Sequence, residues 1–187
     1  MGGVIYLIGA ITVQYKLFPY PQLVELRNSI KAPNYLNNPN YIMLTEQYKL
    51  YDSQADIVML GDSITFGLNW NELFNINIVN RGISGDITEG FLNRLDSIYS
   101  ANPKKVFIMG GINDIYRGVK VNQIFSNYIK IIEALKSKNI VPYIQSTLYN
   151  SARNDLNSSV TELNTLLKEY ALKNNINNLP LFENYYL

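Results

Sequence analysis

Three short stretches of the sequence carry residues that could act together as a nucleophile and its flanking hydrogen-bond donors. Ser63 lies in GDSIT, where it directly follows an apolar run. Gly85 lies in NRGISGD, and Asn113 lies in GGIND. A serine hydroxyl attacks a carbonyl carbon once a base removes its proton. Glycine lets the backbone approach a ligand closely, and an Asn side chain can donate hydrogen bonds to it. The question is whether the fold brings these three stretches together.

Five short apolar segments are typical of buried β-strands, and each of the first three is followed by one of these loops. The predicted strands are residues 56–60, 76–80, 104–110, 140–146 and 178–183. Their near-continuous apolar character indicates that both faces of the sheet are covered. Ligands of parallel α/β sheets bind outside the carboxyl ends of the strands. We therefore expect Ser63, Gly85 and Asn113 at one edge of the sheet.

Helical patterns alternate with these strands. Apolar residues recur near the 3.6-residue period in 86–100, 121–139 and 158–175. Asp86 and Glu89 have the spacing of a capping box, which predicts that the first of these helices starts at Asp86. The alternation indicates parallel βαβ units, and right-handed crossovers then give a three-layer α/β/α sandwich around a five-stranded parallel sheet.

The first 55 residues differ from this regular pattern. Residues 1–20 contain the uncharged apolar run VIYLIGAITV, about half the length that spans a bilayer. We interpret it as part of a membrane anchor, because the prolines and aromatics that follow indicate an interfacial exit; a buried helix or strand is the alternative. Residues 21–55 are expected to be a linker or wrapping arm with short helices near 22–30 and 42–51. Residues 56–187 form the sheet domain.

Composition argues against several classes of function. A net charge of +1 gives no electrostatic basis for binding nucleic acid. The chain has no cysteine and no histidine, so we expect no metal site and no cofactor. The apolar start favours a membrane-anchored or extracytoplasmic location, whereas Lys16, Arg27 and Lys31 close behind it point the other way. No oligomeric state follows from the sequence.

Together, the three loops resemble blocks of the SGNH, or GDSL, hydrolases, a family of serine esterases, lipases, thioesterases and carbohydrate O-acetylesterases. The resemblance implies that Ser63 is the nucleophile and that the Gly85 amide and the Asn113 side chain are oxyanion donors. It runs from about residue 56 to the C-terminus and implies a flavodoxin-like core. We place Asp62 and Asp114 in the substrate-binding part of the site, as acidic neighbours that hold their loops and take no catalytic role.

The fourth block of that family, Asp-x-x-His, supplies the base and has no counterpart in this sequence. Its expected position falls beyond Leu187, so we expect a domain that is incomplete at its C-terminal side. Loss of a triad member typically costs several powers of ten in rate, which predicts impaired turnover. The substrate implied by the resemblance is a small ester, such as an O-acetylated carbohydrate.

An alternative is a non-catalytic carbohydrate-binding or assembly protein on the same fold. A third interpretation, an unrelated nucleotide-binding or signalling domain, has little support, because the sequence contains no Gly-x-Gly-x-x-Gly or Walker loop.

Overall fold

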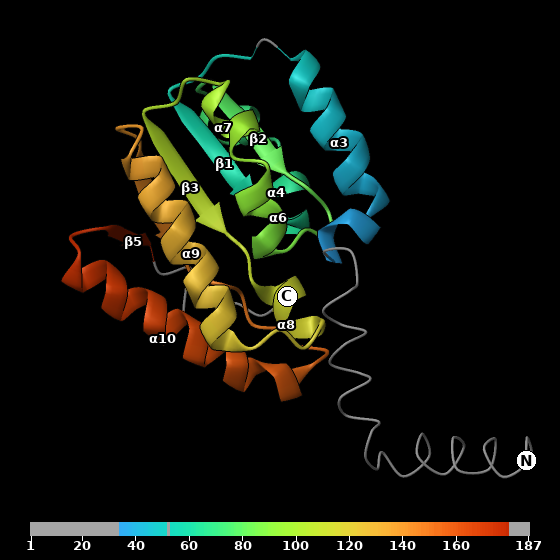
Figure 1. Ribbon diagram of the computed structural model, residues 1–187, viewed down its shortest axis with the longest axis vertical. Helices are drawn as coiled ribbons and strands as arrows, with labels where there is room; N and C mark the ends of the chain where they lie inside the picture. The colour runs from blue at the N-terminus through green and yellow to red at the C-terminus, as the bar shows by residue number, and fades with distance from the viewer. Residues whose placement is uncertain (1–33, 52, 180–187) are drawn as a thin grey trace, which may run out of the picture. The chain divides into compact units, whose positions relative to one another are not determined.

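The computed structural model describes residues 34–51 and 53–179 and contains one five-stranded parallel sheet (Figure 1). The strands are β1 (Ile57–Gly61), β2 (Ile78–Gly82), β3 (Lys105–Met109), β4 (Val141–Gln145) and β5 (Asn177–Leu179). Their order in the sheet is β2-β1-β3-β4-β5, the flavodoxin-like order. The predicted α/β fold is confirmed. Each predicted strand overlaps an observed one, and residues 180–183 of the fifth lie outside the described part.

Helices lie on both faces of the sheet because the chain leaves β1 toward β2 and later crosses back to β3. Right-handed crossovers in opposite directions place the connecting helices on opposite faces. The first crossover holds α4 (Ser63–Phe66) and α5 (Trp70–Phe74). The helices of the later crossovers are α6 (Thr88–Asn93), α7 (Asp96–Tyr99), α8 (Ile112–Tyr116), α9 (Val121–Lys136), the 3₁₀ turn η2 (Asn154–Leu156) and α10 (Asn157–Lys173).

The alternation of side chains along the strands produces two apolar cores. Val58 and Leu60 of β1 point to the main core, which also contains residues of α6, α7, α9 and α10. On the other face, Met59 and Ile78 pack against Trp70 of α5. The Trp70 indole donates a hydrogen bond to the Thr65 carbonyl oxygen at 2.9 Å, which joins α5 to α4.

A third cluster joins the segment before β1 to a loop of the sheet. Here η1 (Asn34–Asn37) leads into α3 (Pro39–Leu50), which overlaps the helix predicted at 42–51. Three α3 side chains pack against two isoleucines of the NRGISGDI loop. The residues are Tyr41, Leu44 and Tyr48 on α3, and Ile83 and Ile87 on the loop. Part of the predicted arm is therefore packed on the loop that carries Gly85.

The single helix predicted over 86–100 is wrong. It is divided into α6 and α7, because the backbone at Arg94 leaves the helical conformation (φ −125°, ψ 22°). The predicted capping box is also wrong, because α6 starts at Thr88 and Asp86 does not cap it. Instead, the Thr88 N–H donates to the carboxylate of Asp114 in α8, at 3.1 and 3.2 Å.

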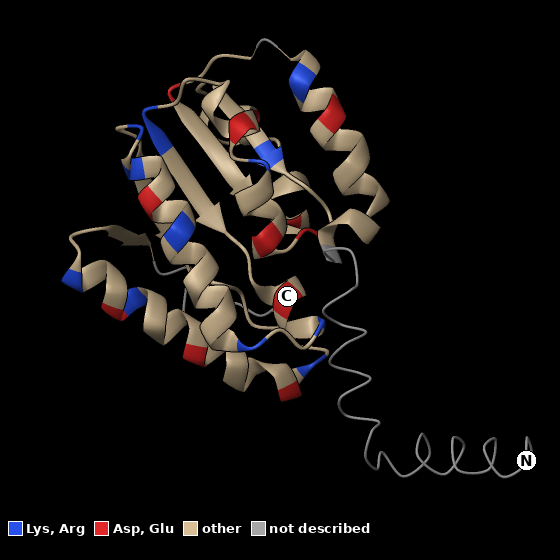
Figure 2. Ribbon diagram, in the orientation of Figure 1, with Lys and Arg blue, Asp and Glu red and all other residues tan. Residues whose placement is uncertain are grey.

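The apolar run within residues 1–20 and the helix predicted at 22–30 lie outside the described residues. Across 34–51 and 53–179, no helix has the length and apolar character that crossing a bilayer requires. Basic and acidic residues are interspersed along the helices and loops (Figure 2).

Gly82 allows α4 to approach β2, and a substitution there should disturb the site. A Cβ at Gly82 would lie 2.2 Å from the Phe66 backbone nitrogen, so α4 would have to shift. We expect Gly82→Ala to lower the free energy of unfolding by about 2 kcal/mol, measured by urea denaturation. Gly67→Ala is the matched control, because Gly67 has an ordinary φ of −74° and a Cβ there would lie 3.2 Å from the Ser63 carbonyl oxygen, a milder contact. Equal losses in the two variants would contradict this account.

Candidate active site

The carboxyl ends of β1, β2 and β3 bring the three loops to one edge of the sheet. Gly61 at the end of β1 is paired in register with Gly82 of β2 and Met109 of β3. The Ile83 N–H continues the pairing and donates to the Gly61 carbonyl oxygen at 3.0 Å. Because the strand order reverses between β1 and β3, this edge is the place where such sheets bind ligands.

Ser63 is the first residue of α4, and its hydroxyl is exposed. A serine at the start of a helix often serves as its N-cap. Here Asp62 takes that place, and its Oδ1 accepts the Ile64 N–H at 3.0 Å. No group among the described residues forms a hydrogen bond with Ser63 Oγ. The hydroxyl is therefore available for chemistry at the sheet edge.

Hydrogen-bond donors lie on the loops that meet at this edge. The backbone N–H groups of Ser63 and Gly85 donate to no other described residue. Asn113 Nδ2 donates to the Asp86 carbonyl oxygen at 3.0 Å, which fixes the side chain and leaves its second N–H for another acceptor. Two amides and a fixed carboxamide are the kind of donor set that stabilises an oxyanion.

Asp62 and Asp114 are buried beneath this edge, with exposed fractions of 0% and 1%. Asp114 accepts hydrogen bonds from the Thr88 N–H and, at 2.6 Å, from Thr88 Oγ1. Burial raises the pKa of each carboxyl to about 6. The two carboxylates therefore hold backbone N–H groups of α4 and α6, and their placement in the substrate-binding part of the site stays a prediction.

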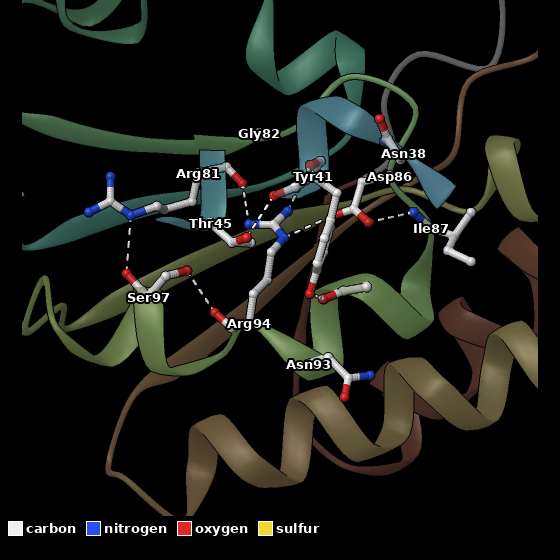
Figure 3. Close-up of polar contacts among 12 residues, drawn as sticks. Asn38, Tyr41, Thr45, Arg81, Gly82, Asp86, Ile87, Asn93, Arg94 and Ser97 are labelled. Atoms are coloured by element: carbon white, nitrogen blue, oxygen red, sulfur yellow. Dashed lines mark hydrogen bonds and ion pairs between the residues drawn. The ribbon is translucent and has the colours of Figure 1, made fainter. Parts of the chain in front are cut away.

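A buried ion pair joins the Gly85 loop to the strand ends (Figure 3). Arg94 Nε donates to Asp86 Oδ2 at 2.8 Å, and the two side chains are 1% and 0% exposed. The other guanidinium nitrogens donate to the carbonyl oxygens of Arg81 at 2.7 Å and Gly61 at 3.1 Å. Burial raises the pKa of the Asp86 carboxyl, and the positive charge of Arg94 opposes this effect. One guanidinium thus connects β1, β2 and the loop.

Sequence reasoning missed Arg94, although a signal was present. Arg94 lies between Phe91 and Leu95, on the apolar side of the predicted helix. A charged residue on an apolar stripe needs a buried partner, and Asp86 is that partner. Asp86 also has the spacing of a helix cap, so the sequence alone favours a cap over an ion pair at this position.

The described residues contain no cluster of three acidic side chains that could hold a metal ion. The site described above consists of a hydroxyl, amide donors and buried structural carboxylates.

Comparison with known proteins connects this geometry to a family. The GDSL-like lipase/acylhydrolase family profile matches residues 59–186. Among curated proteins, the chain is similar to the N-acylneuraminate cytidylyltransferase of Streptococcus agalactiae, with 27% identity over 140 residues. The match covers 73% of this chain and 32% of that protein, so the chain spans about a third of the length of the curated relatives it matches.

Solved structures have the same fold. A Streptococcus pneumonia structure whose name refers to platelet activating factor has a TM-score of 0.70 and 25% identity, covering 87% of this chain and 82% of that one. A GDSL-like lipase from Bacteroides thetaiotaomicron has a TM-score of 0.64 and 22% identity, covering 75% and 77%.

Removal of the buried cation should unfold this region more readily. Arg94→Met leaves the buried Asp86 carboxylate without its counter-charge and removes one donor each from the carbonyl oxygens of Arg81 and Gly61. We expect a loss of about 3 to 5 kcal/mol in the free energy of unfolding, measured by urea denaturation. Lys104→Met is the control, because Lys104 forms an exposed ion pair with Asp56 at a similar distance of 2.9 Å and should change little. Similar losses in both variants would refute the structural role of Arg94.

The raised pKa of Asp62 predicts a pH-dependent stability. Between about pH 4 and 6 the folded chain binds this proton and the unfolded chain releases it, so this contribution to stability is lost as pH rises through 6. Asp62→Asn keeps an acceptor for the Ile64 N–H and cannot ionise. We expect the variant to gain on the order of 2 kcal/mol relative to the parent chain between pH 4 and pH 7.5.

Urea denaturation at several pH values measures this difference. The exposed Asp56 serves as the control, and Asp56→Asn should follow the parent chain. A constant offset between Asp62→Asn and the parent chain at every pH would exclude a raised pKa at Asp62.

Proposed function

Because the chain belongs to the GDSL-like lipase/acylhydrolase family, a family of ester hydrolases, we propose that Ser63 is the nucleophile of a serine esterase. The observation that carries the proposal is the exposed Ser63 hydroxyl at the edge where the Gly85 amide and the Asn113 carboxamide also lie. Asp62 and Asp114 act in this proposal by holding their loops.

The reaction follows from the chemistry of these groups. Ser63 Oγ forms a bond to the carbonyl carbon of the ester, and its proton passes to a base. The carbonyl oxygen becomes an oxyanion that accepts hydrogen bonds from the Ser63 and Gly85 N–H groups and from Asn113 Nδ2. Collapse breaks the bond to the alcohol, which leaves with a proton. Water then hydrolyses the acyl-serine and regenerates the hydroxyl.

The usual base of a serine esterase is a histidine, and this chain does not supply one. There is no histidine among the 187 residues. An ordinary carboxylate is a weak base at pH 7, and Asp62 is fully buried and engaged with the α4 amide. We infer that turnover by this chain alone is slow and that an imidazole placed near Ser63 would accelerate it.

For the substrate, we propose a small acyl ester on a carbohydrate. The Streptococcus agalactiae relative is named for chemistry on N-acylneuraminate, an acylated sugar.

The lack of histidine also favours a second candidate, a carbohydrate-binding protein on the same fold without turnover. This candidate predicts saturable glycan binding that is unchanged by Ser63→Ala. It also predicts no ester hydrolysis under any condition, which separates it from the esterase.

Imidazole rescue tests the esterase directly. We expect the purified chain to hydrolyse 4-nitrophenyl acetate slowly, with a rate that rises when imidazole is added. Ser63→Ala should remove the enzyme-dependent increase and leave only the reaction of imidazole in solution. A serine-directed phosphonate should label the parent chain and spare Ser63→Ala, as detected by mass spectrometry.

Ser158→Ala is the matched control, because Ser158 is exposed on α10, outside the three loops. It should keep both the rescue and the labelling. If Ser63→Ala retains the imidazole-dependent rate, Ser63 is not the nucleophile.

A further inference from the structure

We propose that Asn38 is a positioning residue for the oxyanion hole, an inference that rests on the proposed esterase function. Its side-chain amide holds the peptide between Ser84 and Gly85 in one orientation, with the Gly85 N–H on the side away from Asn38. Asn38 lies in the segment before β1, outside the residues 59–186 that match the family.

One hydrogen bond fixes the orientation of this peptide. Asn38 Nδ2 donates to the Ser84 carbonyl oxygen at 2.8 Å. That carbonyl belongs to the same peptide unit as the Gly85 N–H. In a planar trans peptide the C=O and N–H bonds point in opposite directions. A donor fixed on the carbonyl side therefore fixes the direction of the Gly85 N–H as well.

Asn38 is itself held in place. It is 9% exposed, and its Oδ1 accepts the Asn40 N–H at 3.0 Å as the N-cap of α3. One face of the carboxamide lies against Gly85, since a Cβ at Gly85 would come within 3.3 Å of Asn38 Nδ2. Both ends of the Asn38 carboxamide are therefore engaged, one by the helix and the other by the loop.

Helix α3 is in turn anchored to the same loop. Tyr41 and Tyr48 pack with Ile83 and Ile87, the apolar residues on either side of Gly85. Figure 3 shows Asn38 beside the loop that carries Asp86 and Ile87. Asn38 is thus held at the start of α3, and α3 packs on the loop that carries Gly85.

The next peptide is held from the opposite loop. An Arg117 guanidinium nitrogen donates to the Gly85 carbonyl oxygen at 2.8 Å. Arg117 directly follows α8, the short helix that carries Asn113. The two peptides that flank the Gly85 α-carbon are therefore fixed by Asn38 and Arg117. Gly85 adopts a φ of +74°, which only a few residue types accept readily. The two hydrogen bonds hold the Gly85 backbone in this conformation.

The test separates the donor function of Asn38 from its capping function. Asn38→Ser keeps an N-cap oxygen but is too short to reach Ser84, and Asn38→Asp keeps the size but has no N–H. We expect both variants to shift the Gly85 amide resonance of the ¹⁵N-labelled chain. We also expect both to weaken binding of a serine-directed boronate by about tenfold or more. The reason is that a reoriented Gly85 N–H no longer forms a hydrogen bond with the boronate oxygen.

Tyr41→Phe is the matched control. It removes a different buried hydrogen bond of α3, from Tyr41 Oη to the Gly90 carbonyl oxygen at 3.2 Å, and leaves the Ser84–Gly85 peptide untouched. It should leave the Gly85 resonance and the boronate affinity unchanged. Urea denaturation of all three variants confirms that they are folded.

Failure of the two proposals gives different results. If the parent chain binds no boronate but the Gly85 resonance responds to Asn38→Ser, the esterase proposal fails while the contact that orients the peptide stands. If Asn38→Asp and Asn38→Ser leave both the resonance and the affinity as in the parent chain, the positioning role is overturned.

Discussion

The buried ion pair between Asp86 and Arg94 is the contact on which the other features of the site depend. It is formed at 2.8 Å with almost no solvent exposure, and the same guanidinium binds the carbonyl oxygens at the ends of β1 and β2. A buried pair adds to stability only when its remaining hydrogen-bonding groups are satisfied. Here they are satisfied by backbone atoms of the site itself, so the fold and the site share one set of contacts.

Contacts extend from this pair to the other loops. The Asp86 carbonyl oxygen accepts a hydrogen bond from Asn113 Nδ2. The Asp114 carboxylate accepts one from the N–H of Thr88, the first residue of α6. Asn127 of α9 donates to Thr88 Oγ1 at 2.9 Å, which connects the same group to the main core. Polar groups that are buried and mutually hydrogen-bonded hold loops more rigidly than apolar packing alone. This rigidity is what a preformed oxyanion hole needs.

Much of the fold could be predicted because its signals are local. Apolar runs such as 56–60 and the period of 121–139 each require only neighbouring residues to be recognised. The short helices α4, α5 and α8 were missed, since four or five residues are too few to show a period. The break at Arg94 was not predicted, because the apolar period of 86–100 continues across it.

The site divides in the same way. Ser63, Gly85 and Asn113 could be chosen from residue type and from their position after strands. The burial of Asp62 and Asp114, and the cap that Asp114 provides to α6, depend on how separate loops meet. Asn38 lies in a segment that the sequence presents only as an arm, and its contact with Ser84 spans 46 positions of the chain.

In the proposed site, one oxyanion is bound by donors from three loops, the N–H groups of Ser63 and Gly85 and the Asn113 side chain. A crystal structure of the chain carrying a phosphonate adduct tests this most directly. The account predicts a covalent bond to Ser63 Oγ, with a phosphonyl oxygen within hydrogen-bond distance of the Gly85 N–H and of Asn113 Nδ2. An adduct on another residue, or one whose oxygen points away from both donors, would contradict it.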